Sequence, residues 1–271
     1  MLPRPSVRPR DAHGDGRGRM SKYKRLSVLD NTGGQGKVWK AQIAGTETYV
    51  ALKYLKYEPG SSRDERSKQK IRFVREVESQ RKLNHPGIMP VLSCATHLSP
   101  PWYAMPLATH SLQQVLSGPR LELEWAESVM TEVMDAVEYS HAQGVIHRDL
   151  KPNNILFVDG KWVVSDFGYC RNLDSQSAVI TEQQRLVGSF AYAAPEQFDD
   201  AHQATPAADI FSLTKILIHC LTWQIPYPYS RIDATPDHWH AFLTRGIAEN
   251  PAHRPQSVAD FRSSLSGLLE N

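Results

Sequence analysis

Four polar side chains in one stretch, HRDLKPNNILFVDGKWVVSDFG, have the types and the spacing that phosphoryl transfer requires. Asn154 and Asp166 offer amide and carboxylate oxygens, the hard ligands that Mg²⁺ accepts beside phosphate oxygens. Asp149 lies five residues before Asn154 on the same loop, and we expect it to face an attacking hydroxyl. Lys151 would then face the phosphoryl group in transfer.

A predicted hairpin brings these side chains together. Asp159-Gly160 separates the apolar runs ILFV and KWVV, and this dipeptide between strand-like runs indicates a two-residue β-turn. Pairing of the two strands places Asn154, before the first, close to Asp166, after the second.

A glycine-rich segment, residues 26–40, provides candidates for phosphate binding. Backbone without Cβ can approach phosphate oxygens closely and present N–H groups to them. The segment fits the pattern G-x-x-G-x-V, and Asn31 stands where a longer G-x-G-x-x-G-x-V loop has its first glycine. An ordinary glycine-rich hairpin explains this segment equally well when it is taken alone. The binding candidates are Asn31, Gly33, Gly34, Gly36 and Val38.

Lys53, seventeen residues after Gly36, could reach the same phosphates. Its segment YVALKYL alternates like a half-buried strand, with Val50 and Leu52 on one face and Ala51 and Lys53 on the other.

The segment KIRFVREVESQRKLNHPGI, which follows Lys53 in the chain, predicts an amphipathic helix that ends before Pro86. Ile71, Val74 and Val77 recur every third residue and mark its expected apolar face. Glu76 lies beside that face and could turn inward to pair with Lys53, although a helical Glu that faces water is the more common situation.

Two later segments are predicted to form helices. The first, in the segment AESVMTEVMDAVEYSHAQG, has an apolar stripe and ends near Gly144. The second, residues 209–221, is apolar almost all round and predicts a central buried helix. The stripe consists of Ala126, Val129, Met130, Val133, Met134 and Val137.

The charge of the 271-residue chain is unevenly distributed. Lys and Arg number 31 and Asp and Glu 29, but residues 1–19 alone hold five Arg and two Asp. We expect residues 1–19 to be a disordered basic leader, and translation could begin at Met20 instead of Met1. The near-neutral remainder argues against a nucleic-acid-binding core.

The chain shows no secretory signal and no apolar run long enough for a transmembrane helix, so we expect no integral membrane association. Three widely spaced cysteines, Cys94, Cys170 and Cys220, predict neither a disulfide framework nor a zinc site and favour a cytoplasmic location.

With five ordered motifs, the chain resembles the eukaryotic-like, or Hanks-type, serine/threonine protein kinases. The motifs are G-x-x-G-x-V at 33–38, VALK at 50–53, HRDLKPNN at 147–154, DFG at 166–168 and APE at 194–196. The resemblance implies an α+β, bilobal protein-kinase fold, with a small β-rich N-lobe and a larger, mainly α-helical C-lobe. The implied kinase domain is 20–271, with the N-lobe at about 20–105, the hinge at about 106–109 and the C-lobe at about 110–271.

The resemblance also implies roles for individual residues. ATP and Mg²⁺ would be required: Lys53, paired with Glu76, would hold the α- and β-phosphates, and Asn154 and Asp166 would ligate the metal. Asp149 would accept or orient the proton of the substrate hydroxyl. The adenine would lie among Val38, Ala51 and Leu156, in front of Met105, with Pro106 and Ala108 offering backbone groups to its edge. Pro106 replaces the acidic residue that the family usually has, which leaves the ribose contacts open.

Further implied contacts are structural or regulatory. Glu196 would pair with Arg254, and Asp209 would hold the backbone of the catalytic loop. The expected partner is a protein substrate with a Ser or Thr acceptor, and a transient homodimer would allow autophosphorylation. Arg148 before Asp149 is typical of kinases whose activation loop is positioned by a phosphate. The acceptor candidates are Ser175, Ser177 and, as first choice, Thr181, while Ser189 is expected to contact the catalytic loop.

Two other functions fit part of the pattern. A pseudokinase would bind nucleotide or partners without turnover, but such proteins typically lack at least one of the polar residues that are all present here. A small-molecule kinase of the aminoglycoside-phosphotransferase type shares the Asp-plus-metal chemistry but would not be expected to carry both HRDLKP and APE.

Overall fold

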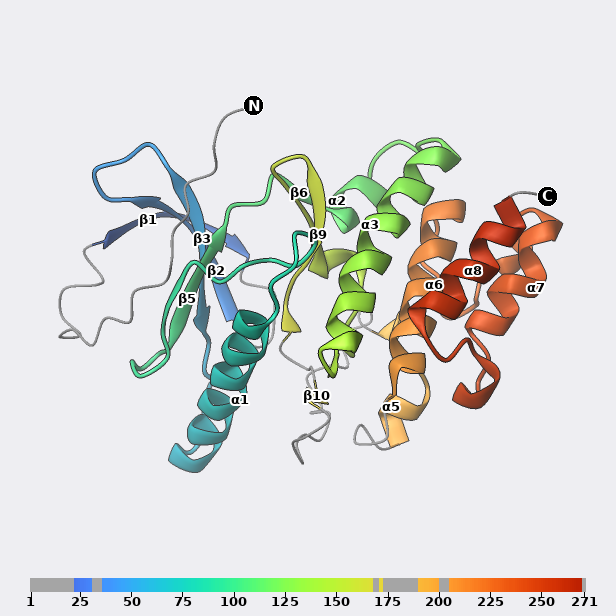
Figure 1. Cartoon of the computed structure of the whole chain (residues 1–271). Coiled ribbons are helices and arrows are strands. Elements are labelled where there is room, and N and C mark those ends of the chain that lie inside the picture. The colour runs from blue at the N-terminus through green and yellow to red at the C-terminus, as the bar shows by residue number, and fades with distance from the viewer. Residues whose placement is uncertain (1–21, 31–35, 168–170, 173–189, 200–204, 270–271) are drawn as a thin grey trace.

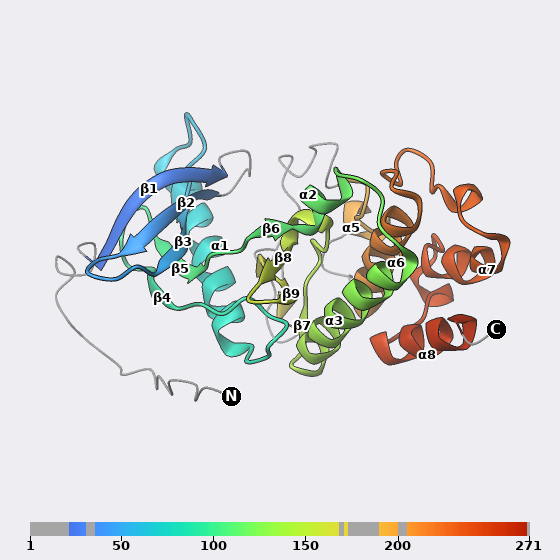
Figure 2. The same ribbon diagram turned by 90° about the horizontal axis from the view of Figure 1, so that it is seen from above.

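The computed structural model describes residues 22–30, 36–167, 171–172, 190–199 and 205–269 of the chain. Figures 1 and 2 show an antiparallel sheet at one end of the molecule and a group of helices at the other. A chain of two such parts is the bilobal α+β arrangement that the motifs imply.

The first part is a five-stranded sheet with the strand order β1-β2-β3-β5-β4, in which all neighbours are antiparallel. Its register places Lys53, on β3, opposite Val38 on β2 and opposite Tyr103 on β5. The strands are β1 (Tyr23–Asp30), β2 (Gly36–Ile43), β3 (Tyr49–Leu55), β4 (Ser93–Ala95) and β5 (Trp102–Pro106).

The central strand β3 is buried on both faces, so the expectation of a half-buried strand is wrong. Val50 and Leu52 pack with Trp102 on one face, and Ala51 packs on the other in a cluster with Phe73 of the neighbouring helix. The alternation along β3 is therefore real, but it separates two apolar environments instead of core and water. A strand flanked on both edges and covered on both faces can accommodate this.

Helix α1 (Arg63–Lys82) lies against the sheet and begins at a capping box formed by Ser62 and Glu65. Its buried positions are Phe73, Glu76, Val77 and Gln80. Ile71 is 48% exposed, so the apolar face expected from Ile71, Val74 and Val77 is wrong at its first member. The spacing of three alone drifts around a helix with 3.6 residues per turn, whereas the observed face alternates steps of three and four.

The second part consists mainly of helices, and residues 107–109, between β5 and β6, connect it to the sheet. Its helices are α2 (Leu112–Leu116), α3 (Leu123–Ala142), α5 (Glu196–Asp199), α6 (Pro206–Thr222), α7 (Asp237–Gly246) and α8 (Val258–Leu269), with 3₁₀ turns η2 (Pro152–Asn154), η6 (Ile232–Ala234) and η7 (Pro251–His253). Its strands are β6 (His110–Ser111), β7 (Val145–Ile146), β8 (Ile155–Val158), β9 (Lys161–Val164) and β10 (Arg171–Asn172).

The predicted hairpin is confirmed as β8 and β9, which pair from Ile155–Val164 to Val158–Lys161. Asp159 and Gly160 have φ angles of 49° and 81°. Both central residues of a type I′ turn need positive φ, which explains why Asp-Gly stands there.

The two predicted C-terminal helices are also confirmed. All six members of the α3 stripe are buried, and every residue of α6 from Ala207 to Thr222 is buried. α3 and α6 pack in one large cluster that also includes Trp239 of α7 and Phe261 of α8. Among the described residues, no helix is both long and apolar enough to cross a membrane.

A buried ion pair ties α5 to the C-terminal helices. The guanidinium of Arg254, which is 1% exposed, donates to both carboxylate oxygens of Glu196 at 2.7 and 2.9 Å. It also donates to the backbone oxygens of Ala207, Ala248 and Glu249. All donors of a buried guanidinium need such acceptors, because an unsatisfied buried charge is costly.

Gly246, at the end of α7, is a position where packing tolerates no side chain. A Cβ added there would lie 2.2 Å from Thr214 Oγ1 on α6. We expect Gly246→Ala to lower the free energy of unfolding by about 1–3 kcal/mol, measured by urea denaturation, because overpacking forces neighbours apart.

Two matched variants test this explanation. Gly267→Ala in α8, where an added Cβ meets no atom within 4 Å, should not destabilise the protein. Gly246→Ala combined with Thr214→Ala should be more stable than Gly246→Ala alone. Equal losses for Gly246→Ala with and without the Thr214 change would contradict the steric explanation.

Candidate active site

Lys53 lies between two carboxylates that come from distant parts of the chain. Its Nζ donates to Glu76 Oε1 of α1 at 2.7 Å and to Asp166 Oδ1 at 2.8 Å. The contact expected between Lys53 and Glu76 is therefore formed. Tyr103 on β5 adds a hydrogen bond from its hydroxyl to the same Glu76 oxygen at 3.1 Å. The side chains of Lys53 and Glu76 are 9% and 1% exposed, whereas that of Asp166 is 34% exposed, so the cluster opens to solvent on the Asp166 side.

The charged groups in this cluster shift one another's pKa values. Burial alone would lower the pKa of Lys53, but the carboxylates of Asp166 and Glu76 outweigh it and hold that pKa well above its ordinary value. Burial would raise the pKa of Asp166, but Lys53 outweighs it and lowers that pKa to about 2. Burial raises the pKa of Glu76, with Lys53 opposing the shift. Lys53 and Asp166 are consequently charged at neutral pH.

The catalytic-loop candidates surround Asp149. Lys151 Nζ lies 2.8 and 3.1 Å from the two oxygens of Asp149. Asn154 donates from Nδ2 to the backbone oxygen of Asp149 at 2.8 Å and to its Oδ2 at 3.2 Å. The Asn154 amide is thereby oriented with its nitrogen toward Asp149, and among the described residues its Oδ1 accepts no hydrogen bond.

The hairpin connects this loop to Asp166 as expected. The N–H of Ser165, next to Asp166, donates to the backbone oxygen of Asn154 at 2.8 Å. Among the described residues, no group of three His, Cys, Asp or Glu side chains could hold a metal ion. Asn154 and Asp166 offer one amide and one carboxylate oxygen, so a metal held there would need phosphate oxygens and water as further ligands. Mg²⁺ is bound in this way beside nucleotide phosphates, and the donor set fits it.

Asp209, at the start of α6, holds the loop backbone as expected. Its carboxylate accepts from the N–H groups of His147 and Arg148, each at 2.8 Å, and from His141 Nε2 at 2.7 Å. Burial would raise the pKa of Asp209, but the hydrogen bonds from His141 and the backbone of His147 outweigh it and lower that pKa.

These hydrogen bonds support a strained backbone. Arg148 has a φ of 66° and Asp166 one of 64°, the left-handed region that non-glycine residues rarely adopt. Asp209 accepts a hydrogen bond from the N–H of Arg148, and Gln197 Nε2 donates to the carbonyl oxygen of Arg148 at 2.8 Å. Strained residues of this kind persist where surrounding contacts determine their conformation, and they cluster at functional sites.

The residues expected around the adenine share one apolar cluster. Ala51 and Met105 are buried in it, and Val38, Ala108 and Leu156 are partly buried against it. Pro106 ends β5 and pairs with Val50. A Cβ added to Gly36 would lie 3.0 Å from Lys53 Cε, so the glycine permits the close approach of β2 to the lysine.

Several sequence predictions fall outside the described residues. These are the leader 1–19, the loop residues Asn31, Gly33 and Gly34, Cys170, the acceptor candidates Ser175, Ser177 and Thr181, and Ser189.

The sequence reasoning missed three residues that support the site: Tyr103, His141 and Gln197. Tyr103 faces Glu76 because β5 pairs with β3, and no local pattern in the sequence predicts that pairing. The polar position of His141 in the last turn of α3 is a weak signal, since most such residues are solvated. Gln197 also accepts from the N–H of Ala194, at a point where the sequence shows only an ordinary helix start.

Comparisons with known proteins agree with this geometry. A family model described as "Protein kinase domain" matches residues 30–270. The chain is 31% identical, over 92% of its length and 34% of the relative's, to a probable serine/threonine-protein kinase, PkwA, of Thermomonospora curvata. It is 29% identical, over 90% of its length and 46% of the relative's, to the serine/threonine-protein kinase PknE of Mycobacterium bovis. The chain thus spans about a third to a half of these curated relatives.

A solved structure shows the same fold. The PknI kinase domain of Mycobacterium tuberculosis superposes with a TM-score of 0.67 at 24% sequence identity, covering 91% of this chain and 96% of that one. This likeness concerns the fold alone.

The lowered pKa of Asp209 predicts how its contribution to stability depends on pH. Above the pKa of an unfolded Asp, about 3.9, the carboxylate contributes its full stabilisation, and this is lost as the pH falls through the lower folded value. We expect Asp209→Asn to lower the free energy of unfolding by about 1–3 kcal/mol at pH 7, and the difference from wild type to shrink below pH ~4. Urea denaturation across this pH range measures both.

The exposed Asp233 offers a control, since Asp233→Asn should change stability little at either pH. A difference between wild type and Asp209→Asn that stays constant down to pH ~2 would contradict the role of the charged carboxylate.

Proposed function

The chain belongs to the protein kinase family, among its Hanks-type serine/threonine members, and from this premise we propose that it transfers the γ-phosphoryl group of ATP to a Ser or Thr hydroxyl of a protein. The observation that carries the proposal is the arrangement of Lys53 between Glu76 and Asp166. A pseudokinase typically lacks at least one of the charged or amide groups that bind phosphate and metal. Here all five groups are present: Lys53 contacts both carboxylates, and Asn154 contacts Asp149, which favours turnover.

In this proposal Lys53 binds the α- and β-phosphates of ATP. Glu76 holds the ammonium from the α1 side, and Tyr103 holds Glu76. Because Glu76 is buried and Asp166 is partly exposed, Lys53 remains anchored to Glu76 if Asp166 turns to a metal.

Asn154 and Asp166 would hold Mg²⁺, which when bound offsets the negative charge on the phosphates. Asn154 Oδ1, which accepts no hydrogen bond from the described residues, and the low pKa of Asp166 support this assignment, because a metal ligand needs an available oxygen and a carboxylate ligand must be deprotonated.

Asp149 would orient the acceptor hydroxyl and accept its proton. Its carboxylate is held by Lys151 and Asn154, so its direction is determined before substrate binds. Lys151, which contacts the carboxylate of Asp149, would also face the phosphoryl group in transfer, where its charge would stabilise the transition state. Such positioning by polar groups is how this class of enzyme lowers the barrier.

The apolar cluster of Val38, Ala51, Met105, Ala108 and Leu156 would receive the adenine. Gly36, and with it Asn31, Gly33 and Gly34, would cover the phosphates. The division into a leader at 1–19, an N-lobe at about 20–105, a hinge at about 106–109 and a C-lobe at about 110–271 belongs to the same proposal. The cytoplasmic location stays a prediction from the cysteine pattern.

Asp149→Asn tests the proposed chemistry. We expect wild type with radiolabelled ATP and Mg²⁺ to phosphorylate a generic basic protein, and the variant to do so at least about 100-fold more slowly, because the catalytic base is lost. Removing Mg²⁺ with a chelator should abolish transfer by wild type.

Asp135→Asn, which changes an exposed carboxylate of α3, is the matched control and should leave the rate unchanged. Equal and negligible transfer by wild type and Asp149→Asn would favour a pseudokinase, and label appearing only on added aminoglycosides would favour a small-molecule kinase.

We further propose that the enzyme phosphorylates its own activation loop through a transient homodimer. Incubation with ATP and Mg²⁺ followed by phosphopeptide mapping should find phosphate at Thr181 first, then at Ser175 or Ser177. The rate should rise with enzyme concentration if one copy acts on another, and Asp149→Asn should remain unmodified. Absence of phosphate between 175 and 181 in active wild type would contradict autoactivation at this loop.

A further inference from the structure

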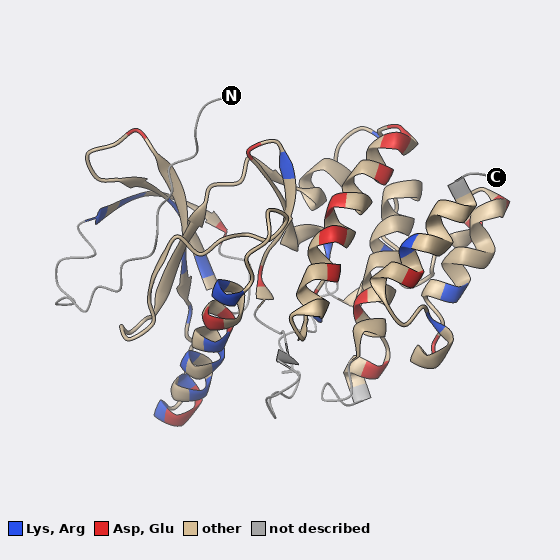
Figure 3. Ribbon diagram, in the orientation of Figure 1, with Lys and Arg blue, Asp and Glu red and all other residues tan. Residues whose placement is uncertain are grey.

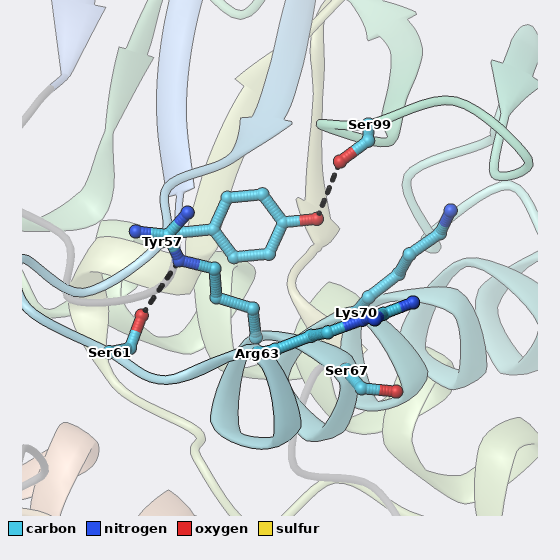
Figure 4. A pocket seen from close by; sticks show the side chains of 7 residues that line it. Tyr57, Ser61, Arg63, Ser67, Lys70 and Ser99 are labelled. Atoms are coloured by element: carbon cyan, nitrogen blue, oxygen red, sulfur yellow. Dashed lines mark hydrogen bonds between the residues drawn. The ribbon is translucent and has the colours of Figure 1, made fainter.

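A hollow of about 710 Å³ lies beside the first turns of α1. Figure 4 shows it between α1, the segment that leads into α1 and the loop that joins β4 to β5. We call this hollow the α1 pocket. It is lined by Tyr57, Ser61, Arg63, Arg66, Ser67, Lys70 and Ser99.

The α1 pocket has a concentrated positive charge. On α1 as a whole, Lys and Arg outnumber Asp and Glu by eight to four, and Figure 3 shows the corresponding blue bands. Within the described part of the chain, no carboxylate lies within ion-pair distance of Arg63, Arg66 or Lys70. Three cations that share one hollow, and that form no ion pair with any described residue, create a site that favours an anion.

Two of these cations are already held in place. Arg66 donates from Nε to Ser61 Oγ at 3.3 Å and lies over the Tyr57 ring at 5.8 Å. Lys70 Nζ donates to the backbone oxygen of His97 at 3.0 Å, which draws it toward the β4–β5 loop. Side chains held in this way lose less conformational entropy when a ligand binds.

The neutral groups of the pocket are hydrogen-bonding hydroxyls. Tyr57 and Ser99 hydrogen-bond to each other at 3.2 Å across the hollow, and Ser67 of α1 also lines it. The end of α1 itself is already capped by Ser62 and Glu65, so the side chains, and not the helix terminus, form the site.

We propose that the α1 pocket binds a phosphate monoester carried on a protein segment. Guanidinium groups match the oxygens of a phosphate with paired hydrogen bonds, and an ammonium and hydroxyls complete the acceptors of a dianion. A hollow of about 710 Å³ is several times larger than one phosphate group and leaves room for the residues on either side of a phosphorylated side chain.

A ligand in the α1 pocket would act on the catalytic centre through β3 and α1, because these two elements lead into or form the pocket. Tyr57 and Ser61 follow β3, which carries Lys53, and Arg63, Arg66 and Lys70 are on α1, which carries Glu76. Lys70 and Glu76 are six residues, or about 9 Å, apart along the helix. A ligand that binds both segments would hold α1 against β3 and favour the Lys53–Glu76 pair. This regulatory part rests on the proposed function, whereas the binding part does not.

Fluorescence polarisation tests binding directly. The probe is a fluorescein-labelled glycine–alanine peptide with one central phosphoserine, and the comparison peptides carry Ser or Glu there. We expect the phosphopeptide to bind wild type at least about tenfold more tightly than either, because only phosphate offers a dianion to three cations. Arg63→Gln with Arg66→Gln, and Lys70→Gln alone, should each remove most of this preference.

Lys82→Gln, in the last turn of α1, is the matched control for general attraction to a basic helix and should keep the preference. The proposal is overturned if the phosphopeptide and the Ser peptide bind equally, or if Lys82→Gln weakens binding as much as the pocket variants do. Inorganic phosphate that displaces the peptide at equal concentration would show a site for the free anion and overturn the assignment to a protein segment.

A second measurement separates this site from the proposed enzyme activity. Saturating phosphopeptide should raise the phosphorylation rate of wild type at least about twofold and leave the pocket variants unchanged, since binding and the active conformation are linked. Phosphate-selective binding by a protein that shows no kinase activity would leave the binding site established and the proposed function refuted. Kinase activity of a wild-type protein that shows no selective binding would refute the binding site and leave the proposed function standing.

Discussion

The charge of one ammonium group links the two parts of this molecule. Lys53 Nζ holds a carboxylate of α1 on one side and, on the other, Asp166 at the end of the β8–β9 hairpin. Taking these charges out of water is costly, so they must be present together and in contact. This requirement places α1 against β3, and it places the end of the β8–β9 hairpin next to Lys53. The surrounding apolar clusters supply the packing, but they would permit many orientations that the charges do not.

Asp209 imposes a similar constraint on the helical part. A fully buried carboxylate at the start of α6 needs several donors, and it finds two of them in backbone N–H groups next to Asp149. The loop that carries Asp149 is therefore attached to α6, which is buried from Ala207 to Thr222, and Arg148 can keep a left-handed conformation. The strained backbone near the candidate active site is stabilised by hydrogen bonds whose partners lie in the core.

The sequence predicted the local elements where one physical signal dominates. The stripe on α3, the uninterrupted burial of α6 and the Asp-Gly turn follow from helix period, composition and turn geometry, and all three are confirmed. The buried face of α1 and the double burial of β3 were not predicted correctly. A spacing of three residues from Ile71 drifts around the helix and does not determine the buried face, and the packing of α1 against the sheet is what buries Phe73 instead.

By itself, the sequence determined the family, and it predicted the kind of chemistry and the residues that would perform it, because ordered motifs preserve side-chain types at given spacings. Only the tertiary structure decided which groups support them: Tyr103 beside Glu76, His141 beside Asp209, and Gln197 on the carbonyl of Arg148. It also gathered Tyr57, Arg63 and Ser99 around one hollow. These contacts join residues far apart in the chain, and such distances depend on the packing of whole elements rather than on any local pattern.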